Sequence, residues 1–197
     1  MTSLKSSFAV TADNYLKALQ ACFSPGIINS VESLAKELRE AWIYGRNVYL
    51  CGNGGSASNA MHIANDFHYG IGACGPGSKT NGLRVEALPS NSSIITCLAN
   101  DISYDDIYSH QLEVKGRPGD LLIILSGSGN SPNVVKALQT ASALEMRSFA
   151  ILGFSGGRCL ELADFPIHFA VDDMQLAEDT QLIVGHLCMK WLAANKP

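Results

Sequence analysis

The sequence predicts an α/β fold: a five-stranded parallel sheet flanked by helices, with two extra helices at the N-terminus. Two observations support this prediction. Short apolar runs of strand length alternate with longer segments whose apolar residues recur at helical spacing. Two of these runs also end in turns rich in Gly and Ser, just before a helical segment begins. Strands that alternate with helices form a parallel sheet with right-handed crossovers.

The length and composition indicate a single domain over residues 1–197. Of the 197 residues, 47% are hydrophobic and 16% are charged, so a sizeable core can be buried. The net charge is −4 and no run of Lys or Arg occurs, which argues against nucleic acid as a ligand. No apolar run approaches the length of a membrane span, and the N-terminus lacks the apolar core of a signal peptide. We therefore expect neither nucleic acid nor membrane as a partner.

Cysteine usage points to the cytoplasm. The six cysteines are scattered along the chain without a CxxC pair. This pattern suits buried, reduced thiols rather than a disulfide framework. They are Cys22, Cys51, Cys74, Cys97, Cys159 and Cys188.

Two helices precede the first predicted strand. Apolar residues recur at helical spacing over residues 7–21 and again over residues 26–41. A doubly wound sheet does not need these two helices, and such a pair often covers a partner subunit. We therefore expect residues 1–45 to form a helical extension used in oligomerisation.

The first Gly-rich turn follows a predicted strand at residues 47–51 and precedes a helix. Its residues are Gly52, Asn53, Gly54, Gly55 and Ser56. Glycines let the backbone approach a ligand closely, and the helix N-terminus presents unpaired N–H groups that favour an anion. The alternative is a tight strand–helix turn without a ligand, because a single Gly-rich turn is a weak signal.

Two pairs, each of an imidazole and a carboxylate, lie on two predicted helices. His62 and Asp66 are four residues apart and share one helix face. Glu178 and His186 are eight residues apart on the last helix, expected over residues 174–193, and lie on nearly the same face. The alternatives are a surface polar pair for the first two and a core or interface histidine for His186.

The remaining elements are predicted from apolar runs that are bounded by Gly, Pro and Asn, residues that favour turns. A loop is expected over residues 69–82, strands at 84–88, 120–125, 147–152 and 165–171, and helices at 94–99, 104–114, 134–144 and about 159–162. Residues 90–93 offer caps for the helix at 94–99.

A second turn rich in hydroxyl groups follows the strand at residues 120–125. It contains Ser126, Gly127, Ser128 and Ser131, and Pro132 suits the first turn of the next helix. Hydroxyls and free backbone N–H groups suit a phosphate monoester, although ordinary Ser/Gly turn chemistry is the alternative. Both turns are expected at the carboxyl edge of one parallel sheet, where open α/β sheets bind ligands.

Several separate blocks resemble the sugar isomerase (SIS) domain family, and within it the phosphoheptose isomerases that act on sedoheptulose 7-phosphate. The blocks are Gly52–Ser58 with His62, Leu98–Asp101, Gly116–Asp120, Ser126–Asn133, Gly156-Gly157 and Gly185-His186. The resemblance implies a flavodoxin-like three-layer sandwich that forms a homotetramer with sites between subunits. It places the sugar phosphate on Ser126, Gly127, Ser128 and Ser131, and it places the sugar beside Asn53, Gly54, Gly55, Ser56, Asn100, Asp101 and Glu178.

The same resemblance implies a zinc site and a reaction. The ligands would be His62, Asp66, Glu178 and His186, which form a reasonable zinc donor set. Two of them depart from the family pattern: Asp66 stands where the family has Glu, and Glu178 stands where it has Gln. Asp66, His186 and Glu178 are the expected catalytic residues, with Asp66 as the base, or Glu178 if the two carboxylates have exchanged roles.

The implied activity is aldose–ketose isomerisation through an enediol(ate). The product would be a heptose 7-phosphate for surface polysaccharide (lipopolysaccharide precursor) synthesis in the cytoplasm. One alternative is an isomerase for another phosphosugar. The other is a non-catalytic protein that binds phosphosugars or associates with a replication initiator.

Overall fold

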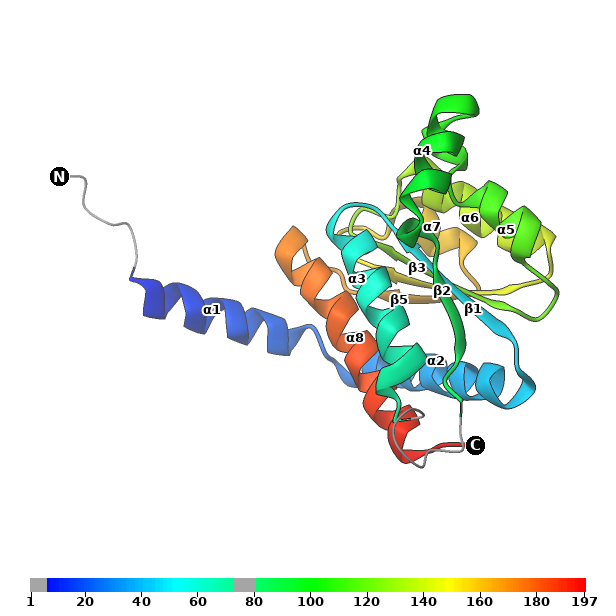
Figure 1. The fold of residues 1–197 in the computed structure, drawn as a ribbon. Coiled ribbons are helices and arrows are strands. Elements are labelled where there is room, and N and C mark those ends of the chain that lie inside the picture. The colour runs from blue at the N-terminus through cyan, green and yellow to red at the C-terminus, as the bar shows by residue number, and fades with distance from the viewer. Residues whose placement is uncertain (1–6, 73–80) are drawn as a thin grey trace.

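The computed structural model describes residues 7–72 and 81–197 and contains the predicted five-stranded parallel sheet (Figure 1). The strand order is β2-β1-β3-β4-β5, and every pairing is parallel. The strands are β1 Asn47–Gly52, β2 Arg84–Ala87, β3 Leu121–Ser126, β4 Arg147–Leu152 and β5 Phe165–His168. Because all strands run in one direction, their carboxyl ends meet at one edge of the sheet.

Helices cover both faces of the sheet and give the molecule three layers. They are α1 Phe8–Ala21, α2 Pro25–Tyr44, α3 Gly55–Asn65, α4 Ser92–Asp101, α5 Ser109–Lys115, α6 Pro132–Ala143, α7 Gly157–Leu162 and α8 Met174–Ala194. Alternate residues of β3 divide the core: Ile123 packs with α2, α3 and α8, whereas Ile124 packs with α5, α6 and α7. This alternation confirms the predicted α/β fold.

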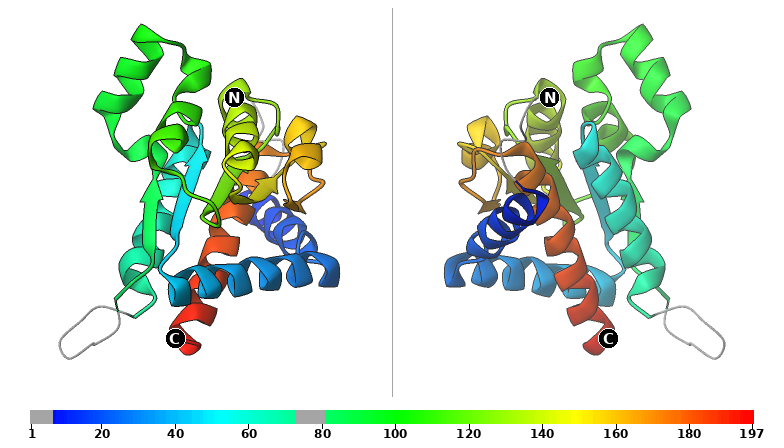
Figure 2. Two further views of the ribbon diagram at one scale, coloured as in Figure 1. Left: turned by 90° about the vertical axis from the view of Figure 1, so that its right-hand side faces the viewer. Right: turned by 90° about the vertical axis from the view of Figure 1, so that its left-hand side faces the viewer.

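The two N-terminal helices differ in how they contact the domain. In α2, five residues are buried against the sheet: Val31, Leu34, Ala35, Leu38 and Ala41. In contrast, α1 buries none and extends away from the body (Figure 1), leaving Phe8 and Leu16 exposed. Both views of Figure 2 show α2 lying across the base of the domain, while α4 stands out at the opposite end. Thus, of the two N-terminal helices, α2 belongs to the core layer and α1 projects.

Two predicted elements differ from those observed. Residues 104–114 do not form one helix: a 3₁₀ turn over Tyr104–Asp106 precedes α5. The separate turn arises because the Ser103 hydroxyl accepts from the Asp105 N–H at 3.1 Å. The last strand ends at His168 rather than at residue 171, because the Val171 N–H donates to the Phe169 carbonyl and not to β4.

Two further expectations can be compared with the described ranges. Within residues 7–72 and 81–197, no helix combines the length and apolar character needed to cross a membrane. Five of the cysteines lie in these ranges and are free thiols; Cys74 lies outside them, as does most of the loop expected over residues 69–82.

Candidate active site

The first Gly-rich turn joins β1 to α3 at the carboxyl edge of the sheet. Gly54 has φ +56° and immediately precedes α3, a backbone conformation that favours glycine. Ser56 in the first turn of α3 is buried. The hydroxyl of Tyr108 donates to the Gly52 carbonyl at 2.5 Å, and burial raises the pKa of that phenol. The turn is therefore held in place by a neutral donor from the opposite face of the sheet.

Three of the predicted metal ligands converge. The Nε2 atoms of His62 and His186 lie 3.0 Å apart, and each lies 3.5 Å from Oδ2 of Asp66. Among the described residues, these three side chains form a group able to hold a metal ion. Zinc binds such ligands at about 2.0–2.2 Å, which places tetrahedral ligand atoms about 3.3 Å apart. The observed separations fit this value, so two imidazoles and one carboxylate suit zinc and leave a coordination position for substrate.

The convergence takes place within one chain. The resemblance implied sites between subunits, but these three side chains meet without a partner chain. The reason is that α8 is 21 residues long and packs against α3 as well as α2. The contact is close, since Gly185 has no room for a Cβ beside Ile63. Thus α8 lies beside α3 (Figure 1), and this packing brings His186 to His62.

A π-helical turn begins at Asp66. The Ile71 N–H donates to the Asp66 carbonyl at 2.9 Å, and the turn continues α3 over Asp66–Gly70. Such turns are frequent at functional sites because they re-aim side chains. Gly70 lies beside the Asp66 carboxylate, where a Cβ would come within 3.4 Å of Oδ1. A side chain at residue 70 would therefore press against this carboxylate, which is itself largely buried.

Glu178, the fourth predicted ligand, lies elsewhere on α8. Its carboxylate packs directly against Gly55, so that a Cβ at residue 55 would overlap it. It is not in the group formed by His62, Asp66 and His186. Its main-chain carbonyl accepts from Asn59 Nδ2 at 2.9 Å, which ties this turn of α8 to α3. The structure therefore separates the two carboxylates: Asp66 is at the imidazoles, and Glu178 is at the Gly-rich turn.

The second turn joins β3 to α6 at the same edge. Ser126 is buried and its Oγ accepts from the Gly129 N–H at 3.0 Å, whereas Ser128 is exposed and its Oγ accepts from the Asn130 N–H at 3.3 Å. Ser131 immediately precedes α6 without using its hydroxyl as a cap. Gly127 lies against Met174 at the start of α8. The Ser131 hydroxyl is thus not committed to the loop backbone.

The two remaining predicted sugar contacts lie at the end of α4. Asn100 donates to Asp101 at 2.7 Å, and both are exposed. Sequence reasoning missed two nearby residues, Tyr104 and Asn133. Both hydrogen bond to Asn53, at 3.2 Å and 2.8 Å. The position of Asn133 just after Ser131-Pro132 was the available signal.

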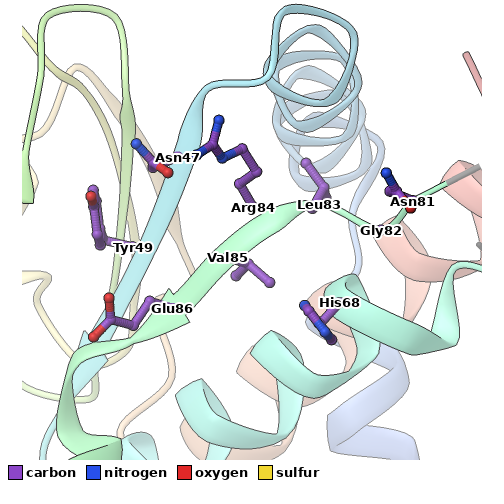
Figure 3. Close-up of a pocket in the computed structure, with 9 residues that line it drawn as sticks. All are labelled: Asn47, Tyr49, His68, Asn81, Gly82, Leu83, Arg84, Val85 and Glu86. Atoms are coloured by element: carbon purple, nitrogen blue, oxygen red, sulfur yellow. The ribbon is translucent and has the colours of Figure 1, made fainter.

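One cavity among the described residues lies away from this site. It has a volume of about 630 Å³ and runs along the unpaired edge of β2 (Figure 3). Its lining includes His68, Arg84 and Glu86, and none of the predicted site residues. The candidate active site is instead formed by the two turns and by the cluster of His62, Asp66 and His186.

Comparison with known proteins decides the family. Residues 13–153 match the model of the SIS domain. The chain belongs to the SIS-domain family. It is 39% identical over 165 residues to a phosphoheptose isomerase of Chlorobaculum parvum, covering 81% of this chain and 76% of that protein. It is 36% identical to a phosphoheptose isomerase of Akkermansia muciniphila, covering 89% of this chain and 87% of that protein.

A solved structure extends the comparison to the fold. A phosphoheptose isomerase of Neisseria gonorrhoeae superposes with a TM-score of 0.85 at 24% identity, covering 94% of this chain and 96% of that one. Its fold is the α/β sandwich described above. The two sequence relatives identify this SIS-domain protein as an isomerase.

Proposed function

We propose that this protein is a phosphoheptose isomerase that interconverts sedoheptulose 7-phosphate and D-glycero-D-manno-heptose 7-phosphate. The single observation that carries the proposal is the cluster of His62, Asp66 and His186, which forms where α3 packs against α8. The names of the sequence relatives supply the substrate class. The product would serve surface polysaccharide synthesis in the cytoplasm.

In this proposal each turn has a distinct task. The turn with Ser126, Gly127, Ser128 and Ser131 holds the phosphate, while Asn53, Gly54, Gly55, Ser56, Asn100 and Asp101 line the sugar. His62, Asp66 and His186 hold zinc, with Glu178 facing the sugar. When bound, the zinc supplies polarisation of the carbonyl group.

The isomerisation itself is a proton transfer between neighbouring carbons. A carboxylate removes the proton from the carbon beside the carbonyl, the enediol(ate) forms, and the proton returns to the former carbonyl carbon. The hydroxyl proton moves to the former carbonyl oxygen through solvent, so no oxidant or reductant is consumed. We assign the base to Glu178, because Asp66 Oδ2 lies 3.5 Å from Nε2 of both imidazoles and a carboxylate bound to a metal is a weaker base.

An isomerisation assay tests this function. Purified protein is stripped with a chelator, reloaded with zinc, and incubated with sedoheptulose 7-phosphate. We expect the aldose to form with zinc and to form much more slowly without it. Binding of phosphoheptoses and phosphopentoses with no conversion of any of them would replace this function by that of a phosphosugar-binding protein.

We also propose a homotetramer. The support is α1, which buries no residue in the isolated chain and exposes Phe8, Val10 and Leu16. Tyr15 anchors α1 to α8 by donating to Asp179 at 2.7 Å; burial and that carboxylate raise its pKa to about 12. Light scattering that finds a monomer at micromolar concentration would contradict this proposal.

A further inference from the structure

The amide side chains of Asn53 and Asn133 form a reciprocal pair between the two turns of the site. Asn53 Nδ2 donates to Asn133 Oδ1, and Asn133 Nδ2 donates to Asn53 Oδ1, each at 2.8 Å. Asn133 is 1% exposed, at the start of α6, and Asn53 follows directly on β1. The pair therefore links the β1–α3 turn to the β3–α6 turn.

A third contact fixes which way round the amides lie. The Val134 N–H, which can only donate, bonds to Asn133 Oδ1 at 3.0 Å. The oxygen of Asn133 must therefore face α6, and its nitrogen must face the oxygen of Asn53. If either amide were rotated by half a turn, two donors or two acceptors would face each other.

Tyr104 completes the set. Its hydroxyl donates to Asn53 Oδ1 at 3.2 Å from the 3₁₀ turn after α4. Both acceptor positions of Asn53 Oδ1 are then filled, by Asn133 and by Tyr104, and one of the two Nδ2 hydrogens is used. One N–H remains, and it is the only hydrogen-bonding capacity that the half-buried Asn53 side chain still has.

We propose that Asn133 and Tyr104 are positioning residues that hold Asn53 so that it offers its ligand a hydrogen-bond donor and no acceptor. This proposal rests on the proposed function, which places the sugar beside Asn53. The ligand atom recognised there is an oxygen that accepts a hydrogen bond, such as the carbonyl of an open-chain phosphosugar or a hydroxyl oxygen. A fixed donor needs no reorganisation when charge develops on that oxygen.

The first experiment needs no ligand. Hydrogen exchange of the Asn53 side-chain amide is measured by nuclear magnetic resonance on ¹⁵N-labelled protein, with the signal assigned by its loss in Asn53→Ser. We expect faster exchange in Tyr104→Phe and in Asn133→Ala. Tyr49→Phe is the matched control, because the Tyr49 hydroxyl donates to the Lys115 carbonyl instead. Unchanged exchange of Asn53 in both site variants overturns the proposal.

The second experiment uses sedoheptulose 7-phosphate as the probe. Tyr104 is 54% exposed, so Tyr104→Phe should fold normally while its KM rises by about threefold to tenfold, the effect of one lost neutral hydrogen bond. Tyr49→Phe should leave KM unchanged. An unchanged KM in Tyr104→Phe overturns the proposed recognition. If the exchange experiment succeeds but the wild-type protein binds no phosphosugar, the proposed function fails, whereas the positioning of Asn53 stands.

Discussion

The two strand–turn–helix units of the site share a topology but differ in where the contact partners of their functional side chains come from. In the β3–α6 unit, the hydroxyls of Ser126 and Ser128 bond to N–H groups of their own turn. In the β1–α3 unit, His62 and Asp66 are completed by His186, which is 120 residues beyond Asp66 on α8. One unit is built locally, and the other depends on how α8 packs against α3.

Because the two units are built differently, we expect substitutions to affect metal binding and phosphate binding independently. Changes in the β1–α3 unit should act on metal binding and proton transfer. Changes in the β3–α6 unit should act on phosphate affinity and on the stability of a single turn. Each of the following predictions tests this separation, in order of decreasing expected effect.

The largest effect is expected at the imidazoles. His62→Ala or His186→Ala should weaken zinc affinity by more than about 100-fold, because losing even an outer-shell partner of a ligand costs about 10–100-fold. Competition with a chromophoric chelator measures this change. His110→Ala on α5 is the control and should bind zinc normally. Equal zinc affinity in all three variants would show that the cluster is not the metal site.

The next effect separates the two carboxylates. Glu178→Gln should retain zinc and lower kcat by about 10²–10⁴-fold, the usual contribution of a general base. Asp66→Asn should lower kcat and, unlike Glu178→Gln, should also weaken zinc binding, since Asp66 Oδ2 lies 3.5 Å from Nε2 of both imidazoles. Zinc content and kcat are measured on each variant.

Asp179→Asn is the matched control for this pair, because it lies next to Glu178 and pairs with Tyr15. It should affect neither zinc binding nor kcat strongly. If Glu178→Gln turned over normally and Asp66→Asn kept zinc but lost turnover, the base would be Asp66, as its place in the family pattern suggests.

Local units of this protein could be predicted from sequence, whereas their convergence could not. The Gly52–Ser56 turn, the spacing of His62 and Asp66, and the Ser/Gly turn follow from short-range patterns. The return of α8 to α3 depends on packing across the sheet, such as the close approach of Gly185 to Ile63. Sequence spacing alone could not show that His186, but not Glu178, would reach Asp66.

The hydrogen-bond partners of individual side chains could not be predicted from the sequence either. The contacts of Asn133 and Tyr104 with Asn53 join segments 80 and 51 residues apart. The break between Tyr104–Asp106 and α5 also reflects a side chain, the Ser103 hydroxyl, competing with the helix backbone. Helical periodicity carries no information on such competition.

The smallest effect distinguishes hydroxyls within the β3–α6 turn. Ser131→Ala should weaken binding of sedoheptulose 7-phosphate by about 10–100-fold, the value of a hydrogen bond to a charged group, without lowering the melting temperature. Its hydroxyl makes no cap bond whose loss would destabilise α6. Ser126→Ala should lower the melting temperature, because it leaves the Gly129 N–H without its buried acceptor. Calorimetry and ligand titration measure both quantities.

Zinc content provides the cross-check between the two units. Both serine variants should retain the zinc affinity of the wild-type protein, because the proposed metal ligands lie on α3, α8 and the π-helical turn. If Ser131→Ala lost zinc, or if His62→Ala lost phosphate affinity to the same extent as Ser131→Ala, the two units would not act independently. The β1–α3 and β3–α6 units would then form one cooperative site, in which the loss of one unit's ligand contacts also weakens binding at the other.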